Sequence, residues 1–383
     1  MKSNNIVFVH GMFGWASSEM GGLPYWGKAL TLDTHGFNVH ESSCGPASSF
    51  HDRACEIAAQ IKGTKIDYGE EHSHLANHAQ FSNDYTGIGF IEDWSEENPV
   101  ILIGHSAGAH TCLQLQQLLA DDYWKWGSNA NWIEVIMPIS GVINGSTLPY
   151  FLGCDKSTGL LQGPVGEFIG TIVQALALTS GNSSFYDFDL DQWIGKGYGR
   201  DFDRTISALE ASDFAKGEDN LAFDLSLQGC YKANEKFKTN PDTYYLSIVT
   251  RQTNNGIPKL LMNPVLMASA LYQGHVINFE DNEPIPNWGA GDLDISKWRE
   301  NDGAVSSISQ RYPFTAGNHP VGHEGIFSGE HLVKGDWYFE TADKITGKKF
   351  DHLDVGFGYI SDPTLKSAHI ELYQKIYQLL SEL

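Results

Sequence analysis

The chain has 383 residues, enough for two domains or for one α/β domain with insertions. Acidic residues outnumber basic ones by 47 to 25, and the formal net charge of -22 argues against binding nucleic acid or an anionic lipid surface. Five scattered cysteines form neither a disulfide framework nor a paired metal knuckle, and no apolar run is long enough to span a membrane. The composition favours a globular protein that acts on a neutral or dispersed substrate.

The start of the chain predicts a buried strand. Residues 6–9 (IVFV) are apolar, and the glycine-rich stretch HGMFGW follows directly at 10–15. Residues 36–40 predict a second strand, and residues 54–61 predict a helix that ends before Gly63. Because no basic segment followed by an apolar one opens the chain, we expect an intracellular protein or a mature form whose signal was removed.

The stretch from 99 to 120 predicts a strand, a tight turn and a helix. Residues 100–103 (VILI) are apolar, residues 104–108 read GHSAG, and leucines then recur at helical spacing. A serine held at a sharp strand-to-helix turn presents its hydroxyl at the end of the sheet. We therefore interpret Ser106 as a nucleophile, the alternative being a structural turn whose serine only caps the helix. The backbone N–H groups of Met12 and Ala107 are predicted to form an oxyanion hole.

A long interruption separates the first strands from the later ones. Residues 132–139 (WIEVIMPI) predict a strand, but the alternation of strands and helices stops between 144 and 240. Within this interruption, residues 166–178 are mostly apolar and of helical length. They predict a lid over the active site or, equally, a buried packing helix.

The strand pattern returns at 244–250, and an amphipathic helix is predicted at 365–380. Together these patterns predict an α/β-hydrolase fold, with a mostly parallel central sheet and helices on both faces. We expect residues 1–383 to form a single domain with a lid or cap insertion at 144–240.

A serine nucleophile needs a histidine base and a carboxylate that orients the histidine. In α/β-hydrolases these follow the serine in the order acid, then histidine. Asp302, in the turn Asn-Asp-Gly, and His352, just before an apolar segment, fit this order best. The competing residues are His319, His323, His331, Asp292, Asp294 and Asp336.

Residues 64–98 are polar and rich in histidine, and we interpret them as an insertion. His72, His74 and His78 lie here, with Asp67 and Asp52 nearby. Histidines with carboxylates suit Zn²⁺. The spacing is no standard zinc signature, so solvated loop histidines are the alternative interpretation.

With these residues in place, the chain resembles the thermoalkalophilic bacterial lipases and, more widely, the staphylococcal lipases. The resemblance runs in order along nearly the whole chain, through VHGMFGW (9–15), HDRACE (51–56), IDYGEEHSHLANHAQF (66–81), IGHSAG (103–108), FDLDQW (188–193), FDLSLQG (223–229), NPDTYYLS (240–247), LMN (261–263), ENDGAVSSIS (300–309) and FDHLDV (350–355). It implies a secreted triacylglycerol lipase that acts on lipid esters at an oil–water interface, with a zinc-stabilised cap, a calcium site and a helical lid. Carried over by position, the triad is Ser106, Asp302 and His352, and the oxyanion donors are Met12 and Ala107.

The resemblance also implies two structural metal sites. Its zinc ligands correspond to Asp52, His72, His78 and Asp224, which leaves His74 and Asp67 as bystanders; the zinc-binding insertion is then 64–98. Its calcium ligands correspond to the backbone carbonyl of Leu261 and to Asp354, Asp362 and Pro363. At the calcium site the family has Glu in place of Asp354 and Gly in place of Leu261, and this chain inserts residues between Asp354 and Asp362.

Two rival functions stay open from the sequence. One is a carboxylesterase or acyltransferase that prefers short acyl groups. The other is a zinc-stabilised lipid-binding protein without activity. Acyl-chain preference, regioselectivity and oligomeric state are not set by these patterns.

Overall fold

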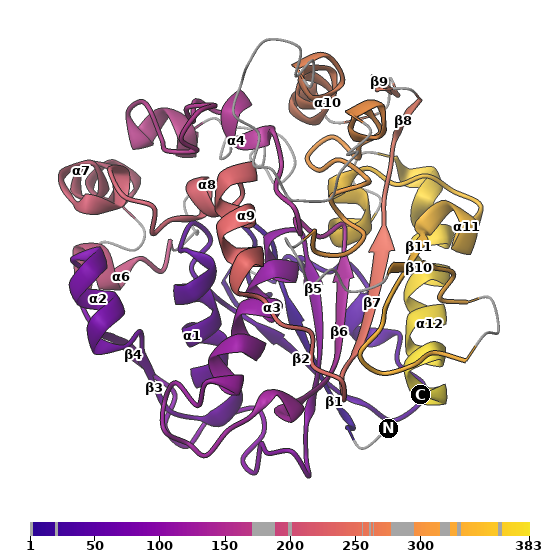
Figure 1. Ribbon diagram of the computed structural model, residues 1–383, viewed down its shortest axis with the longest axis horizontal. Helices are drawn as coiled ribbons and strands as arrows, with labels where there is room; N and C mark the ends of the chain where they lie inside the picture. The colour runs from indigo at the N-terminus through magenta and orange to yellow at the C-terminus, as the bar shows by residue number, and fades with distance from the viewer. Residues whose placement is uncertain are drawn as a thin grey trace.

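The computed structural model describes residues 3–19, 22–170, 188–197, 201–254, 256–259, 262, 264–276, 295–314, 322–327, 331–358 and 362–383. Its centre is a seven-stranded sheet in the order β10-β11-β7-β6-β5-β1-β2 (Figure 1). The strands are β1 (Asn5–Val9), β2 (Asn38–Ser42), β5 (Val100–His105), β6 (Ile133–Ile139), β7 (Tyr244–Val249), β10 (Gly322–Glu324) and β11 (Trp337–Thr341). All six neighbouring pairs are parallel, which confirms the predicted parallel α/β sheet.

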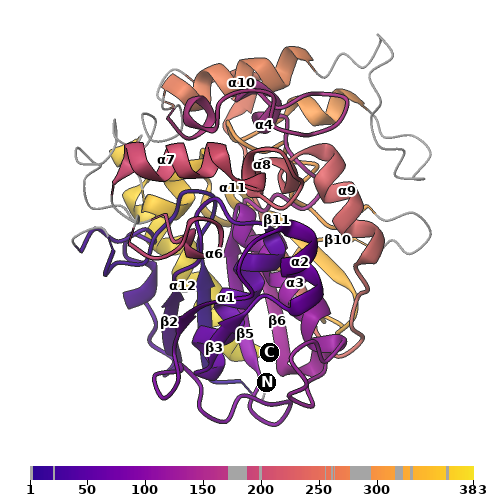
Figure 2. The ribbon, with the colours of Figure 1, turned by 90° about the vertical axis from the view of Figure 1, so that its left-hand side faces the viewer.

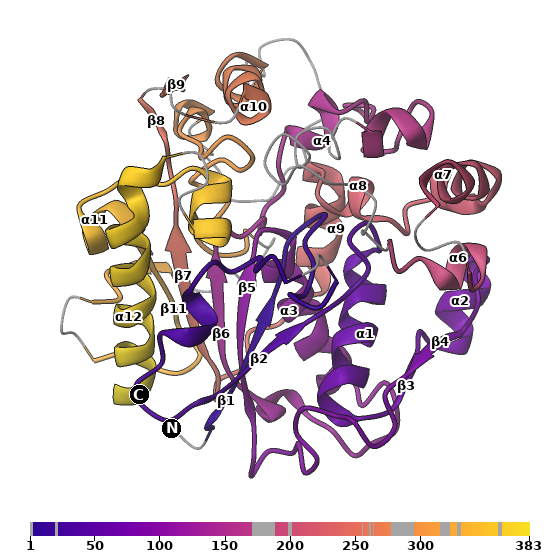
Figure 3. The ribbon, with the colours of Figure 1, turned by 180° about the vertical axis from the view of Figure 1, so that it is seen from behind.

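Both faces of this sheet are covered, which is why its central strands β1, β5 and β6 are mainly apolar and fully buried. Every residue of β5 and β6 is buried. Alternate side chains enter two cores: Ile6 and Phe8 pack with α12 (Lys366–Glu382), while Val7 packs with α1 (Phe50–Lys62) and α3 (Ala107–Ala120). Figure 1 shows α1 and α3 on one face, and Figure 3 shows α12 on the other.

The predicted elements match the structure to within a few residues at most of their ends. The first helix begins at Phe50 rather than at residue 54, because the Ser49 side chain accepts a hydrogen bond from the Asp52 N–H (3.2 Å) and caps it. It ends at Gly63, which adopts the left-handed conformation (φ 74°). The strand β11 was not predicted, although its first three residues, WYF, are an apolar run.

The histidine-rich segment 64–98 lies outside the main sheet. It forms the antiparallel pair β3 (Lys65–Asp67) and β4 (Phe81–Asp84), with the short helix α2 (Glu70–Ala76) between them. This segment is poor in helical periodicity, and no helix was predicted in it. The helix α2 has acidic residues in its first turn and ends at Asn77 in the left-handed conformation (φ 62°).

A layer of short helices lies over the carboxyl ends of the strands (Figure 2). It consists of α4 (Leu148–Phe151), α7 (Phe202–Ala211), α8 (Leu221–Asp224), α9 (Leu227–Lys236) and α10 (Pro264–Val276), with α6 (Asp191–Ile194) at its lower edge. Of the predicted lid helix 166–178, residues 166–170 are helical and contribute Phe168 and Ile169 to the buried core; the rest lies outside the described residues.

The remaining elements are short. They are β8 (Thr253–Asn254), β9 (Ile257–Pro258), α11 (Ala342–Thr346), η1 (Ala29–Thr31), η2 (Ala130–Trp132), η3 (Asp213–Ala215), η4 (Ile295–Arg299), η5 (Asp354–Gly358) and η6 (Pro363–Leu365). Among the described helices, none is long and apolar enough to cross a membrane.

Candidate active site and metal cluster

Ser106 stands at the turn between β5 and α3 with a strained backbone (φ 57°, ψ -123°). The flanking glycines permit this turn by their lack of a side chain. A Cβ on Gly108 would lie 2.2 Å from the carbonyl oxygen of Val9, and one on Gly104 would lie 2.5 Å from the carbonyl oxygen of Gly108. The GHSAG stretch is therefore a close crossing of strand and helix that only glycine allows at these two positions.

Ser106, His352 and Asp302 form one hydrogen-bonded row, although they lie far apart in the sequence. Ser106 Oγ lies 2.8 Å from His352 Nε2, and His352 Nδ1 lies 2.9 Å from Asp302 Oδ2. An ionised carboxylate can only accept, so the Nδ1–H of His352 donates to Asp302, which leaves Nε2 free to accept the serine proton.

The Asp302 carboxylate is fully buried and held on several sides. Its Oδ1 accepts the N–H groups of Ala304 (3.0 Å) and Val305 (2.8 Å), and its Oδ2 accepts the Thr250 hydroxyl (2.7 Å). These hydrogen bonds fix the direction of the carboxylate toward His352.

The rival acids and bases fall elsewhere or outside the described residues. His323 Nε2 pairs with Asp336 Oδ2 at 3.5 Å, and both side chains are more than two-fifths exposed. His331 is exposed as well. His319, Asp292 and Asp294 lie outside the described residues.

The two predicted oxyanion donors have free N–H groups beside the serine. Within the described part of the chain, neither the Met12 nor the Ala107 N–H meets a hydrogen-bond acceptor. Ala107 is the first residue of α3, so the positive end of the helix dipole lies at this point. The Gly11 carbonyl, on the same peptide as the Met12 N–H, accepts from His10 Nδ1 (2.9 Å) and from the Gly14 N–H (3.1 Å).

A cavity of about 90 Å³ opens beside Ser106 and His352. Most of its lining is apolar and includes Met12, Val142, Leu148, Leu152, Leu225 and Leu266. Such a wall suits a hydrocarbon chain and offers little to a charged group.

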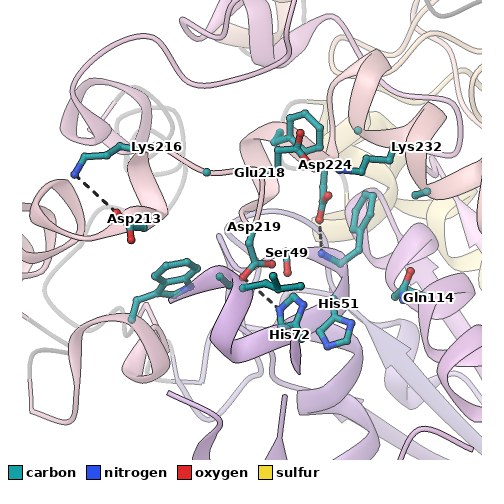
Figure 4. Close-up of a pocket in the computed structure, with 18 of the residues that line it drawn as sticks. Ser49, His51, His72, Gln114, Asp213, Lys216, Glu218, Asp219, Asp224 and Lys232 are labelled. Carbon is teal, nitrogen blue, oxygen red and sulfur yellow. Dashed lines mark hydrogen bonds and ion pairs between the residues drawn. The ribbon is translucent and has the colours of Figure 1, made fainter. Parts of the chain in front are cut away.

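A separate cluster of histidines and carboxylates lies at the edge of the cap (Figure 4). Asp52 of α1, His72 of α2, His78 and Asp219 place one ligand atom each within 4.8 Å of one another. His72 Nε2 lies 3.1 Å from Asp52 Oδ1, and His78 Nε2 lies 3.2 Å from Asp219 Oδ2. His78 Nε2 and Asp219 Oδ2 are buried without a well-formed hydrogen bond.

This donor set fits a divalent metal of the zinc type, which binds two imidazole nitrogens and two carboxylate oxygens readily. Burial disfavours the charged ring of His72, but hydrogen bonds to Asp219 and Asp52 outweigh this and raise its pKa to about 10. The two carboxylates thus favour a positive charge next to them. Predicted ligands Asp52, His72 and His78 are brought together here.

The prediction of Asp224 as the fourth ligand is wrong, because Asp219 takes that place. Asp224 is the last residue of α8, and its Oδ2 accepts the Phe50 N–H (2.5 Å) at the start of α1. Asp219 lies at the other end, just before Asn220, which caps α8. The motif match identified the correct segment of the chain, but it did not show which end of α8 faces the histidines.

The two bystanders behave as expected. Asp67 Oδ1 accepts hydrogen bonds from the Gly69 N–H (2.9 Å) and Gln80 Nε2 (2.9 Å), and His74 is exposed.

The predicted calcium ligands lie only partly within the described residues. Leu261 lies outside the described residues, as do residues 359–361 between Asp354 and Asp362. Asp362 Oδ2 lies 3.2 Å from the Lys259 ammonium, and its Oδ1 accepts the Thr364 N–H and hydroxyl. The resemblance predicts calcium at Asp354, Asp362 and Pro363, whereas in the structure the Lys259 ammonium already supplies a positive charge to Asp362.

Comparison with known proteins finds similarity to lipases. The family described as "Lipase-like, C-terminal domain" matches residues 2–130. The lipase of Staphylococcus hyicus is 27% identical over 95% of this chain and 54% of its own length, and lipase 1 of Staphylococcus aureus is 27% identical over 94% and 52%. The chain spans about half the length of the curated relatives it matches.

Solved structures match over the whole chain. EstA from Clostridium botulinum is 28% identical with a TM-score of 0.77, covering 99% of this chain and 87% of its own. Lipase 1 from Pelosinus fermentans is 26% identical with a TM-score of 0.77, covering 100% of both chains. The Staphylococcus hyicus lipase is 26% identical with a TM-score of 0.70, covering 100% and 95%.

The sheet, the strand-to-helix turn at Ser106 and these neighbours define an α/β-hydrolase-like fold. Within that class, the chain is similar to the staphylococcal lipases along nearly its whole length, in line with the sequence resemblance.

Proposed function

We propose that this protein is a serine carboxylic ester hydrolase that cleaves lipid esters. The observation that carries the proposal is the unbroken row of hydrogen bonds from Ser106 through His352 to Asp302, at the mouth of an apolar cavity. Lipases among its homologues support the same class of reaction.

The proposed reaction has two halves. His352 Nε2 takes the proton of the Ser106 hydroxyl as its oxygen attacks the ester carbonyl carbon, and Asp302 stabilises the resulting imidazolium. The Met12 and Ala107 N–H groups donate to the carbonyl oxygen as it becomes negative. His352 then protonates the departing alcohol, and a water molecule that it activates releases the acid and restores Ser106.

The metal cluster has a supporting role in this proposal. Asp52, His72, His78 and Asp219 would hold a zinc ion that ties segments 64–98 and 144–240 to α1 and takes no part in the reaction. We propose one domain over 1–383, in which these two segments are insertions and the second contains the lid. Secretion stays a prediction from the resemblance.

Initial rates on p-nitrophenyl esters from short to long acyl chains test the proposal. We expect the native chain to be fastest with medium or long chains and Ser106→Ala to lose at least about 10³-fold in kcat. Ser381→Ala, on the outer end of α12, serves as the matched control and keeps native activity.

Other outcomes separate the rivals. Activity confined to the shortest esters would favour the carboxylesterase. A native chain that neither hydrolyses any ester nor reacts with an organophosphonate would favour the lipid-binding protein. Equal rates for the native chain and Ser106→Ala would remove the proposed nucleophile.

A further inference from the structure

Two buried polar side chains connect the oxyanion loop, defined here as residues 10–14, to the segment that bears His352. They are Tyr25, in the loop after β1, and His105, the last residue of β5. Tyr25 is 2% exposed and His105 is 1% exposed. Neither takes part in the reaction proposed above, so their hydrogen bonds call for another explanation.

These hydrogen bonds form an unbroken chain. The Gly11 N–H lies 2.9 Å from Tyr25 Oη, and Tyr25 Oη lies 2.6 Å from His105 Nδ1. His105 Nε2 lies 3.0 Å from the backbone carbonyl oxygen of His352. One row of three hydrogen bonds therefore starts at the oxyanion loop and ends on the backbone of the predicted base.

The backbone groups at the two ends of the row determine which atom donates in each hydrogen bond. The Gly11 N–H can only donate, so Tyr25 Oη accepts it; the His352 carbonyl can only accept, so His105 carries its proton on Nε2. Burial, helped by the nearby His352 ring, holds the pKa of His105 well below its usual range, so the ring is neutral. His105 Nδ1 is therefore an acceptor, and the Tyr25 hydroxyl donates to it.

The surrounding packing leaves this row little freedom. The Tyr25 ring contacts Phe357 of η5 edge to face, with centroids 4.8 Å apart. A Cβ on Gly356 would lie 3.3 Å from the His105 ring, and the His105 and His352 rings lie 4.8 Å apart. The segment 352–358 thus rests directly on the pair Tyr25 and His105, and a shift of either partner moves the other.

The oxyanion loop is fixed from its other side as well. The fully buried Arg53 guanidinium donates to the His10 carbonyl oxygen, and His10 Nδ1 lies 2.9 Å from the Gly11 carbonyl oxygen. The Gly11 carbonyl is therefore held in place, and the Met12 N–H on the same trans peptide points in the opposite direction to it. Tyr25 adds a restraint on the Gly11 N–H.

We propose that Tyr25 and His105 are positioning residues that hold the oxyanion loop and His352 in register with each other. This inference rests on the proposed function, because it assigns these residues to the same reaction. In the transition state, the developing oxyanion must accept its hydrogen bonds while His352 takes the serine proton. A displacement of either partner by a fraction of an ångström therefore destabilises the transition state.

Tyr25→Phe is the first test, because it removes one hydroxyl and keeps the ring. We expect kcat to fall by about 10- to 100-fold and KM to stay within about twofold. The reason is that the oxyanion loop stabilises the transition state more than it stabilises the bound ester. The matched control is Tyr377→Phe, which removes another buried hydroxyl, the one that donates to the Ala29 carbonyl (3.0 Å). That variant should lower the melting temperature and leave kcat within about twofold.

His105 allows a second, independent measurement. His105→Leu should lower kcat as much as Tyr25→Phe, and the double variant should lose little more than either, because both changes break one row. His105→Gln keeps a donor for the His352 carbonyl and should recover part of the loss. Rates measured well below the melting temperature of each variant separate positioning from folding.

Two results would overturn the proposal. One is native kcat in Tyr25→Phe despite a lowered melting temperature. The other is additive losses in the double variant, which would mean two separate structural effects. Ser106→Ala distinguishes this failure from failure of the proposed function: if it is inactive while Tyr25→Phe is fully active, only the positioning role is wrong.

Discussion

Replacing Asp219 tests the metal cluster at the position where the structure differs from the sequence-based prediction, which named Asp224. Its Oδ2 lies 3.4 Å from His72 Nε2 and 3.2 Å from His78 Nε2, so Asp219→Asn removes an anionic ligand from the centre of the cluster. Asp224→Asn is the matched control, because it makes the same change five residues away at the far end of α8.

The expected size of the effect follows from the linkage between binding and folding. At a free Zn²⁺ concentration about 1,000 times Kd, binding stabilises the folded chain by roughly 4 kcal/mol. An unfolding entropy of about 2.1 cal/mol/K per residue gives roughly 0.8 kcal/mol/K for 383 residues. A chelator should therefore lower the melting temperature of the native chain by about 5 °C.

Calorimetry at one scan rate, with and without chelator, and metal content per chain provide the assay. We expect the native chain and Asp224→Asn to hold one zinc and to show the shift. Asp219→Asn should hold little zinc and melt at the same temperature in both conditions. The reasoning would be refuted if Asp219→Asn kept its zinc and its chelator-sensitive melting while Asp224→Asn lost both.

Three further changes test the site and its surroundings. Asp302→Asn should lower kcat by about 10³- to 10⁴-fold, because the amide can hold His352 in the wrong tautomer; a loss below tenfold in ester hydrolysis would exclude Asp302 as the orienting acid. Gly11→Ala should abolish activity, since its Cβ would lie 2.6 Å from Ser106 Cβ; rates close to native would contradict the close approach seen here. Calcium should raise the melting temperature of the native chain by less than about 1 °C relative to EGTA, because the Lys259 ammonium already occupies the carboxylate; a rise of several degrees would show that calcium displaces it.

Local sequence patterns were sufficient to predict the fold class and the strained turn at Ser106. Strands buried on both faces must be continuous apolar runs, so 100–103 and 132–139 could be identified without coordinates. The GHSAG stretch predicted the strained turn at Ser106 because only glycine tolerates so close a crossing. These features depend on neighbours along the chain, which is why local patterns were sufficient.

Which distant side chains meet depends on how the whole chain folds. The order of acid and histidine left several candidates for each role, and only the folded chain places Asp302 and His352 in a row with Ser106. It also put Asp219 rather than Asp224 beside the histidines, because the two carboxylates lie at opposite ends of one short helix turn.

The row through Tyr25 and His105 had no signal in the sequence at all. A buried tyrosine and a buried histidine are common in any core, and their composition does not tell which backbone groups they bind. Their roles depend on hydrogen bonds between residues 14, 80 and 247 positions apart, and such contacts are determined by how the loops at the carboxyl ends of the strands pack together.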